Sequence, residues 1–227
     1  GLAMKFGQPF RVPLANELDV TTLIHWHGLT PPAAQDGVPD FSQPVLRPGE
    51  SYDYDFPITR SGTHWMHSHV GLQEQQLLAA PLIVREVDQP LFEDQEHVVL
   101  LHDFTFRDPK EILAELQGGG HAMHSMGHSG MSEGGMAMLN DVAFDAFLAN
   151  DRTLDDPEVV KAEGGSTMRL RIINAAAASN MWIDLGGLTG ELVAVDGHAV
   201  IPVAGSRFPL AIAQRADIRI RFPAGSG

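Results

Sequence analysis

Short runs in which apolar and polar residues alternate, or in which β-branched residues dominate, recur along the chain and are typical of β-strands. They lie at residues 52–56, 79–84, 97–101, 168–173 and 218–222. Turn-forming residues separate such runs, at 31–32, 36–39, 47–49 and 186–187. This spacing is typical of a β-sandwich rather than of alternating strands and helices. The sequence therefore predicts an all-β fold.

One helix is expected, just after residue 108. Asp108 can cap its first turn, Pro109 suits the first helical position, and Gly118 ends it. Residues 111–116 have one apolar side. We therefore expect a helix on the surface, outside the core layers.

A change of composition at residues 85–94, around Pro90, follows an apolar strand and predicts a domain boundary near residue 88. We expect a first domain over 1–88 and a second over 89–227, each the size of one sandwich. Residues 118–138 interrupt the second domain, with seven Gly, five Met and three His in 21 positions and no strand or helix period. This composition predicts a long surface loop without regular secondary structure.

Composition limits the function classes. The net charge is −14 and no Lys/Arg cluster occurs, which argues against nucleic acid or an anionic membrane surface as the main partner. No apolar run is long enough for a membrane span. The chain has no cysteine, which excludes disulfide scaffolds, thiol nucleophiles and a blue-copper centre formed by this chain alone. The first ten residues do not resemble a signal peptide and no initiator Met is present, so we expect the chain to begin inside a longer precursor.

Two His-x-His pairs, His25/His27 and His67/His69, stand out in the first domain. The two-residue period of a strand would place both members of each pair on one face. Neutral imidazoles are good ligands for copper, zinc and iron, so four of them could form most of one metal site or parts of several. Spacing alone leaves another interpretation open, in which the pairs are structural histidines at strand ends.

The sequence His-Trp-His-Gly at 25–28, followed by Trp-Met-His-Ser-His at 65–69, resembles the first-domain copper signatures of multicopper oxidases. The resemblance covers nearly the whole chain and continues through residues 36–39, 43–44, 47–51, 62–63, 73, 81–84, 150–151, 169–174 and 195–197. It implies two cupredoxin-like Greek-key β-sandwich domains, the first two of three in a laccase-like oxidase of the bacterial copper-resistance type. Such oxidases pass electrons from a type 1 copper to a trinuclear cluster that reduces dioxygen to water.

Carried over by position, the resemblance implies that His25 binds the type 2 copper and that His27, His67 and His69 bind the type 3 pair. Asp36 matches an acidic residue near the type 2 copper, where a carboxylate could relay protons. Alternatively, Asp36 and the glycine after it only form an Asx-type turn. In the family, the type 1 ligands and four further cluster ligands belong to a third domain that this sequence does not contain. We therefore expect the chain alone to be inactive as an oxidase.

Other conspicuous side chains are not expected at the site. His64 is an odd number of residues from His67, so on a regular strand it points to the opposite face. Trp26 and Trp65 are expected to be packing neighbours rather than redox relays. Three further histidines match no copper signature: His97, His102 and His198.

The 118–138 segment has two interpretations. Soft thioether ligands select Cu(I), so a Met/His loop on such an oxidase would gather cuprous ions. Its candidate ligands are Met123, Met126, Met131, Met136, Met138, His121, His124 and His128. The other interpretation is a flexible low-complexity insertion.

Our main hypothesis is the N-terminal two-domain portion of a multicopper oxidase, which supplies half of the trinuclear cluster ligands. The alternatives are a stand-alone copper-binding or copper-tolerance protein without turnover, and a cupredoxin scaffold used for protein interactions. The expected partners are a third cupredoxin domain, dioxygen and copper ions, and the resemblance implies a periplasmic or secreted protein. The reducing substrate is not predicted, because in this family it is oxidised at the type 1 site.

Overall fold

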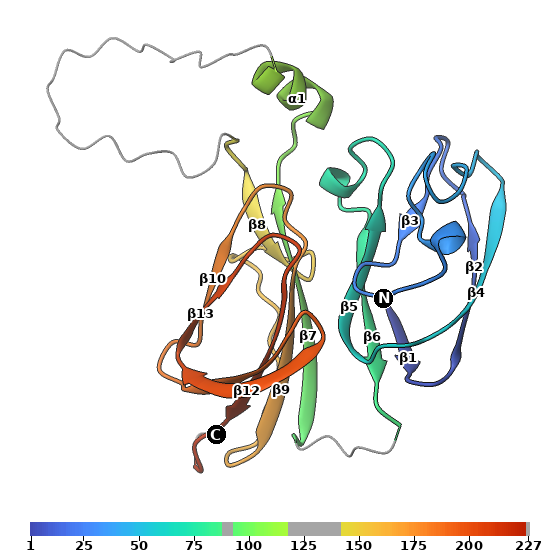
Figure 1. The fold of residues 1–227 in the computed structure, drawn as a ribbon. Coiled ribbons are helices and arrows are strands. Elements are labelled where there is room, and N and C mark those ends of the chain that lie inside the picture. Colours follow the sequence, from blue (N-terminus) through green and yellow to red (C-terminus); the bar gives the residue numbers. More distant parts are fainter. Residues whose placement is uncertain (88–92, 118–141, 226–227) are drawn as a thin grey trace, which may run out of the picture.

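The computed structural model describes residues 1–87, 93–117 and 142–225. Strands dominate these residues, so the predicted all-β fold is confirmed (Figure 1). None of the helices in these three ranges has the length and apolar character needed to cross a membrane. The predicted boundary at residue 88 and the 118–138 segment lie outside the described residues, and both stay predictions.

The first unit consists of a four-stranded sheet, in the order β1-β6-β5-β3, and a two-stranded sheet of β2 and β4. Its strands are β1 (Leu2–Lys5), β2 (Pro9–Ala15), β3 (Ile24–His25), β4 (Ser51–Pro57), β5 (Gly62–Ser68) and β6 (Ala79–Arg85). Two 3-10 turns lie between strands, η1 (Ala33–Gln35) and η2 (Glu74–Gln76). Alternate residues of β4 are buried, as the sequence pattern predicts: Tyr54 and Phe56 pack with Phe10, Leu82 and Val84 in the core between the sheets.

The second unit has a six-stranded sheet, in the order β12-β11-β14-β9-β7-β8, and a two-stranded sheet of β10 and β13. Its strands are β7 (Gln95–Phe104), β8 (Ala146–Ala149), β9 (Thr167–Asn174), β10 (Met181–Asp184), β11 (Gly190–Val195), β12 (His198–Gly205), β13 (Arg207–Leu210) and β14 (Arg215–Arg221). Ile172 and Ile218 of the larger sheet pack against Phe208 and Leu210 of the smaller one. The unit is therefore a second sandwich with its own core.

The expected helix is present as α1 (Pro109–Gln117). The backbone N–H of Lys110 donates to Oδ1 of Asp108 over 2.9 Å, which is the predicted cap. None of the helical residues is buried, and Figure 1 shows α1 at one end of the second unit, beyond its sheets. Both the helix and its surface position are confirmed.

The two units lie side by side, with β5 of the first unit packed against β9 and β14 of the second. Trp65 on β5 packs with Leu100 and Ile173 of the second unit. Beside this apolar contact, Thr63 donates to the buried carboxylate of Asp217. The strand that carries His67 is thereby held by both apolar and polar contacts from the second unit.

Candidate metal centre

The pairing of β3 with β5 brings the two His-x-His pairs together. The two strands are antiparallel, with His25 opposite His67. The backbone contacts continue past the strand ends: the N–H of Trp65 donates to the His27 carbonyl over 3.3 Å, and the N–H of His69 donates to the Leu23 carbonyl over 3.2 Å. Residues 38 to 46 positions apart in sequence therefore lie side by side.

The expectation that each pair lies on one strand face is wrong in detail. β3 ends at His25 and β5 ends at Ser68, so only one member of each pair belongs to a strand. After His25 the chain turns, with the N–H of Leu29 donating to the Trp26 carbonyl and Gly28 at φ +94°. His27 and His69 therefore reach the site from strand ends.

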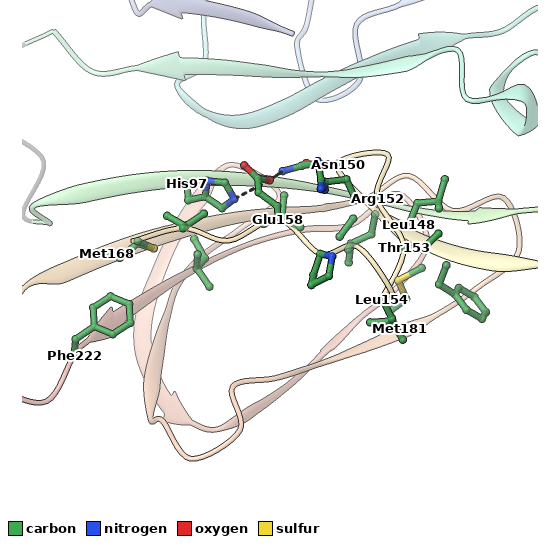
Figure 2. A pocket seen from close by; sticks show the side chains of 17 residues that line it. His97, Leu148, Asn150, Arg152, Thr153, Leu154, Glu158, Met168, Met181 and Phe222 are labelled. Carbon is green, nitrogen blue, oxygen red and sulfur yellow. Dashed lines mark hydrogen bonds and ion pairs between the residues drawn. The ribbon is translucent and has the colours of Figure 1, made fainter. Parts of the chain in front are cut away.

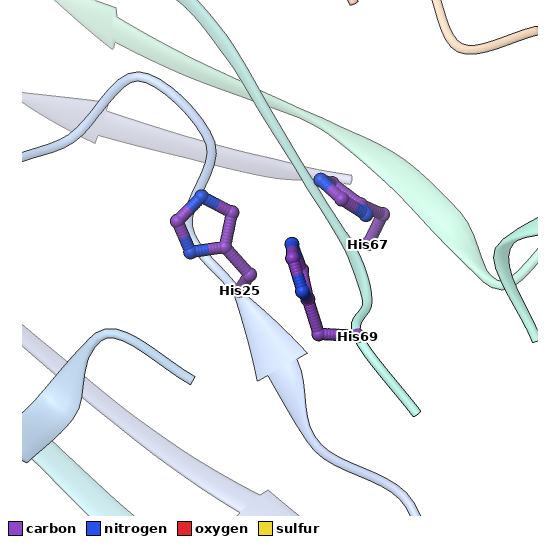
Figure 3. Close-up of side chains that lie close together, drawn as sticks. All are labelled: His25, His67 and His69. Atoms are coloured by element: carbon purple, nitrogen blue, oxygen red, sulfur yellow. The ribbon is translucent and has the colours of Figure 1, made fainter. Parts of the chain in front are cut away.

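The four imidazoles His25, His27, His67 and His69 nevertheless converge, and we call them the histidine cluster. One ligand nitrogen from each of His25, His67 and His69 lies within 4.8 Å of the others, and Figure 3 shows these three rings facing a common space. Nδ1 of His27 is 3.3 Å from Nε2 of His67. Within the described ranges, this is where three or more potential metal-ligating side chains meet at such distances.

The cluster runs from the interior to the surface, because His67 is buried, His25 and His27 are half-buried, and His69 is exposed. Burial lowers the pKa of His27 to about 3, aided by the positive charge of Arg215 and by the neighbouring imidazoles. Burial also lowers the pKa of His69, again with a contribution from nearby rings. Both rings are therefore neutral near pH 7 and keep a lone pair for a metal.

Carboxylates and carbonyls around the cluster determine which ring nitrogens are free. Nδ1 of His25 lies 2.7 Å from the carbonyl oxygen of Asp36 and 3.3 Å from its carboxylate Oδ1. Nδ1 of His67 lies 3.1 Å from Oε2 of Glu74. Because these oxygens can only accept, each Nδ1 carries the proton and each Nε2 presents its lone pair.

Asp36 reaches His25 because the following residue is glycine. Gly37 has φ +75°, and a Cβ there would lie only 1.8 Å from the carbonyl oxygen of Ile24. A larger residue would therefore push the segment away from His25. Asp36 ends the turn η1 through its backbone, and its carboxylate lies beside the cluster, so its role as a proton relay stays a prediction.

The tryptophans pack as expected. Trp65 stacks on His67 with ring centroids 4.2 Å apart and lies 5.0 Å from the His27 ring. Trp26 instead packs in the first core, with centroids 4.7 Å from Phe10 and 4.8 Å from Tyr54. Trp65 thus forms one wall of the site, and Trp26 supports the sheet behind it.

The excluded histidines have other partners. His64 is buried, with Nε2 3.2 Å from the carbonyl oxygen of Ser61, and burial lowers its pKa to about 4. His97 contacts Glu158, His102 contacts the Ala175 carbonyl, and His198 contacts Arg60. The interpretation of His64 as a packed histidine is confirmed.

Two nearby residues were missed by the sequence reasoning, Glu74 and Arg215. Glu74 follows His69 by five residues, and only the turn η2 returns it to His67. Arg215 comes from the second unit, so no local pattern connects it with the cluster. The candidate Cu(I) ligands of the 118–138 segment lie outside the described residues.

A separate cavity of about 420 Å³ lies in the second unit (Figure 2). Its walls are mostly apolar side chains such as Leu148, Met168 and Phe222, with His97 and Glu158 at one side. Among the described residues that line it, no three potential metal ligands converge, so the candidate chemistry belongs to the histidine cluster.

The proteins that this chain resembles are copper proteins. Two family models, both described as Multicopper oxidase, match residues 2–89 and 95–226. Copper resistance protein A of Escherichia coli is 32% identical over 243 residues, which cover 96% of this chain and 40% of that protein. Multicopper oxidase MmcO of Mycobacterium tuberculosis is 30% identical over 229 residues, which cover 96% of this chain and 45% of that protein.

Among solved structures, the multi-copper oxidase from Pseudomonas thermotolerans superposes with a TM-score of 0.79 and 26% identity, covering 100% of this chain and 51% of that one. The chain thus spans less than half the length of the two curated relatives, with 40% and 45% covered.

Proposed function

This chain belongs to the multicopper oxidase family, and we propose that its histidine cluster supplies half of the ligands of a trinuclear copper cluster that reduces dioxygen to water. The observation that carries the proposal is the convergence of His25, His67 and His69 within 4.8 Å, with His27 3.3 Å from His67. In the proposed assignment, His25 binds the type 2 copper, and the other three bind the type 3 pair.

The donor set fits copper. All four proposed ligands are imidazoles, which bind both Cu(I) and Cu(II). His25 and His67 present Nε2 because Asp36 and Glu74 occupy Nδ1, and such outer partners orient ligating histidines in metal sites. Nδ1 of His27 lies 3.3 Å from Nε2 of His67, so these two nitrogens share one space.

Bound copper would supply the electron-transfer chemistry, and the surrounding residues prepare the site for it. Trp65 packs flat on His67 and keeps one wall of the site apolar. Asp36 holds His25 through its carbonyl, and its partly exposed carboxylate lies close enough to pass a proton between solvent and the site. Glu74 fixes the tautomer of His67.

The proposed reaction needs further copper ligands and a type 1 copper besides the described residues. We propose that a third cupredoxin domain provides the remaining cluster ligands and the type 1 copper, where the reducing substrate is oxidised. One relative is named Copper resistance protein A, which supports copper handling as the physiological context. A periplasmic or secreted location and the domain division near residue 88 belong to the same proposal. A stand-alone copper-binding protein is not favoured, because both matching family models are those of oxidases.

The test is titration of the metal-free chain with Cu(II), followed by electron paramagnetic resonance. We expect nitrogen-coordinated Cu(II) in the wild-type chain and binding weakened by about tenfold or more in His25→Gln and His69→Gln. His198→Gln is the control, because His198 is exposed and bonds Arg60 instead. Equal Cu(II) binding in all three variants would contradict the proposal.

A further inference from the structure

Arg215, at the start of β14 in the second unit, lies beside the histidine cluster of the first unit. Its Nη2 atom is 2.6 Å from the position that a Cβ of Gly28 would take. Gly28 directly follows His27, so the absence of a side chain there lets the guanidinium approach the ligand segment. Arg215 is only 5% exposed. A positive charge from one unit is therefore enclosed next to the candidate metal centre of the other.

Neutral groups hold this guanidinium in place. Nε donates to the Thr63 carbonyl over 3.2 Å, Nη1 to the Ala213 carbonyl over 3.1 Å, and Nη2 to the Asp196 carbonyl over 3.3 Å. Carbonyl dipoles orient the charge without cancelling it. The Thr63 contact is on β5, so it also fixes the guanidinium to the strand that carries His67.

Nearby carboxylates neutralise only part of the positive charge of Arg215. Among the described residues, the ion pair of Arg215 is with Asp196 at 3.2 Å, and the Asp196 side chain is 44% exposed and thus weakened by solvent screening. The next carboxylate, Asp217, is already paired with Arg171 at 2.7 Å. The remaining charge faces the segment that carries His27, because Nη2 of Arg215 lies against Gly28.

We infer that Arg215 is a positioning residue through which the second unit shifts the preference of the copper site from Cu(II) toward Cu(I). The inference rests on the proposed copper function. The repulsion between Arg215 and a bound ion is proportional to the charge of the ion, so it is twice as large for Cu(II) as for Cu(I). A fixed charge beside His27 therefore favours the reduced metal without touching it.

The experiment measures the dissociation constants of Cu(II) and Cu(I) for the full chain by chelator competition. Removal of the charge in Arg215→Gln should tighten Cu(II) binding about tenfold, the size of outer-sphere effects in metal sites. The repulsive free energy is half as large for Cu(I) as for Cu(II), so its removal should tighten Cu(I) binding by the square root of that factor, about threefold. Cu(I) sites elsewhere in the chain are the same in all variants and cancel in the comparison.

Asp196→Asn provides the opposite change. It removes the counter-charge, so Cu(II) binding should weaken by about threefold and Cu(I) binding by less. A purely structural role of the Arg215–Asp196 pair predicts a different result, because both substitutions break the same pair and would then shift affinity in the same direction. Arg219→Gln is the matched control, since Arg219 is also on β14 and pairs with Glu191 at 2.7 Å.

The outcomes separate this inference from the copper proposal. Opposite shifts in Arg215→Gln and Asp196→Asn, with Arg219→Gln unchanged, support it. Equal shifts for Cu(II) and Cu(I), or affinities that match those of the Arg219 variant, would overturn it while leaving the copper site intact. If Arg215→Gln does not fold, Asp196→Asn decides, and unaltered Cu(II) binding in that variant refutes the inference. Wild-type chain that binds no copper through His25 would refute the copper proposal itself.

Discussion

Individual carboxylates and carbonyls fix the tautomers of the candidate ligands. The contact between Glu74 and Nδ1 of His67 leaves Nε2 of that ring free for a metal. We predict that Glu74→Ala weakens Cu(II) binding by about tenfold, because the ring loses both its orientation and part of its basicity. Isothermal titration of the metal-free protein measures the effect. Glu111→Ala removes the same charge from the exposed surface of α1, and a loss of equal size there would refute the role of Glu74.

His64 predicts a dependence of stability on pH. Burial, and then the charge of Arg215, lower its pKa from 6.5 to about 4, so the folded protein holds the ring neutral where the unfolded chain protonates it. Unfolding therefore takes up a proton between about pH 6.5 and 4, and stability falls as the pH falls through this range. The contribution of His64 to this loss is about 2 kcal/mol between pH 7 and pH 5.

Urea unfolding at pH 7 and pH 5 tests this prediction. His64→Gln should reduce the loss of stability between the two pH values by about 2 kcal/mol, whatever its effect on stability at pH 7. His198→Gln, which replaces an exposed histidine of the second unit, is the control. The same pH dependence in wild type and His64→Gln would show that His64 is protonated in the folded state.

At this scale, the sequence predicts what depends on local spacing and misses what depends on the fold. The odd separation of His64 and His67 was enough to exclude His64 from the cluster, and in the structure His64 is buried beside Gly197 of the second unit. Glu74 could not be predicted, since its contact needs the turn η2. Arg215 could not be predicted either, because it is nearly 190 residues away from His27 and reaches it through the packing of two separate sandwiches.

At the scale of elements, one side chain ties together the segments that carry the ligands. Oε1 of Gln73 accepts hydrogen bonds from Thr22 over 2.8 Å and from Ser68 over 2.7 Å, and its Nε2 donates to the Thr21 carbonyl over 2.8 Å. Gln73 thereby connects the approach to β3, the end of β5 and the start of η2. The relative position of His25, His67 and Glu74 depends on this connection.

We predict that Gln73→Leu lowers the free energy of unfolding by about 2–3 kcal/mol, because Thr22 and Ser68 are buried and lose their hydrogen-bond acceptor. Cu(II) affinity should fall in the same variant. Chemical denaturation and copper titration measure the two effects, and Gln76→Leu, an exposed position in the same turn, is the control. Stability within about 0.5 kcal/mol of wild type would contradict the structural role of Gln73.

Some strands were predictable from their residue pattern, and others were missed. All five predicted runs occur, as β4, β6, β7, β9 and β14. β12 was missed because nearly all of its residues are exposed, so it has no alternation of apolar and polar positions. β3 was missed because it is only two residues long and is defined by its pairing with β5 rather than by its own sequence.

At the scale of the whole molecule, the two sandwiches meet at a buried polar contact that the sequence gives no means to predict. Nη1 of Arg171 donates to Oδ2 of Asp217 over 2.7 Å and to Oγ1 of Thr63 over 2.9 Å, so a second-unit ion pair holds a first-unit strand. Burial raises the pKa of Asp217, and Arg171 opposes that effect. Arg171 also pairs with Glu96 at 2.7 Å, whereas loss of Arg171 would leave the buried Asp217 carboxylate without its nearest cation. We therefore expect the mutual position of the units to depend on Arg171.

Electron entry through a type 1 copper needs a ligand that this sequence does not contain. A type 1 copper needs a cysteine thiolate, and none of the 227 residues is cysteine. We predict that the copper-loaded chain shows no intense blue absorption and no oxidation of phenols, while it still binds Cu(II) through the histidine cluster. Visible absorption and oxygen consumption with a phenolic substrate measure this, with a complete three-domain oxidase as the positive control. Oxygen consumption by the pure chain, abolished by His25→Gln, would contradict the prediction, because electrons would then reach the histidine cluster without a type 1 centre.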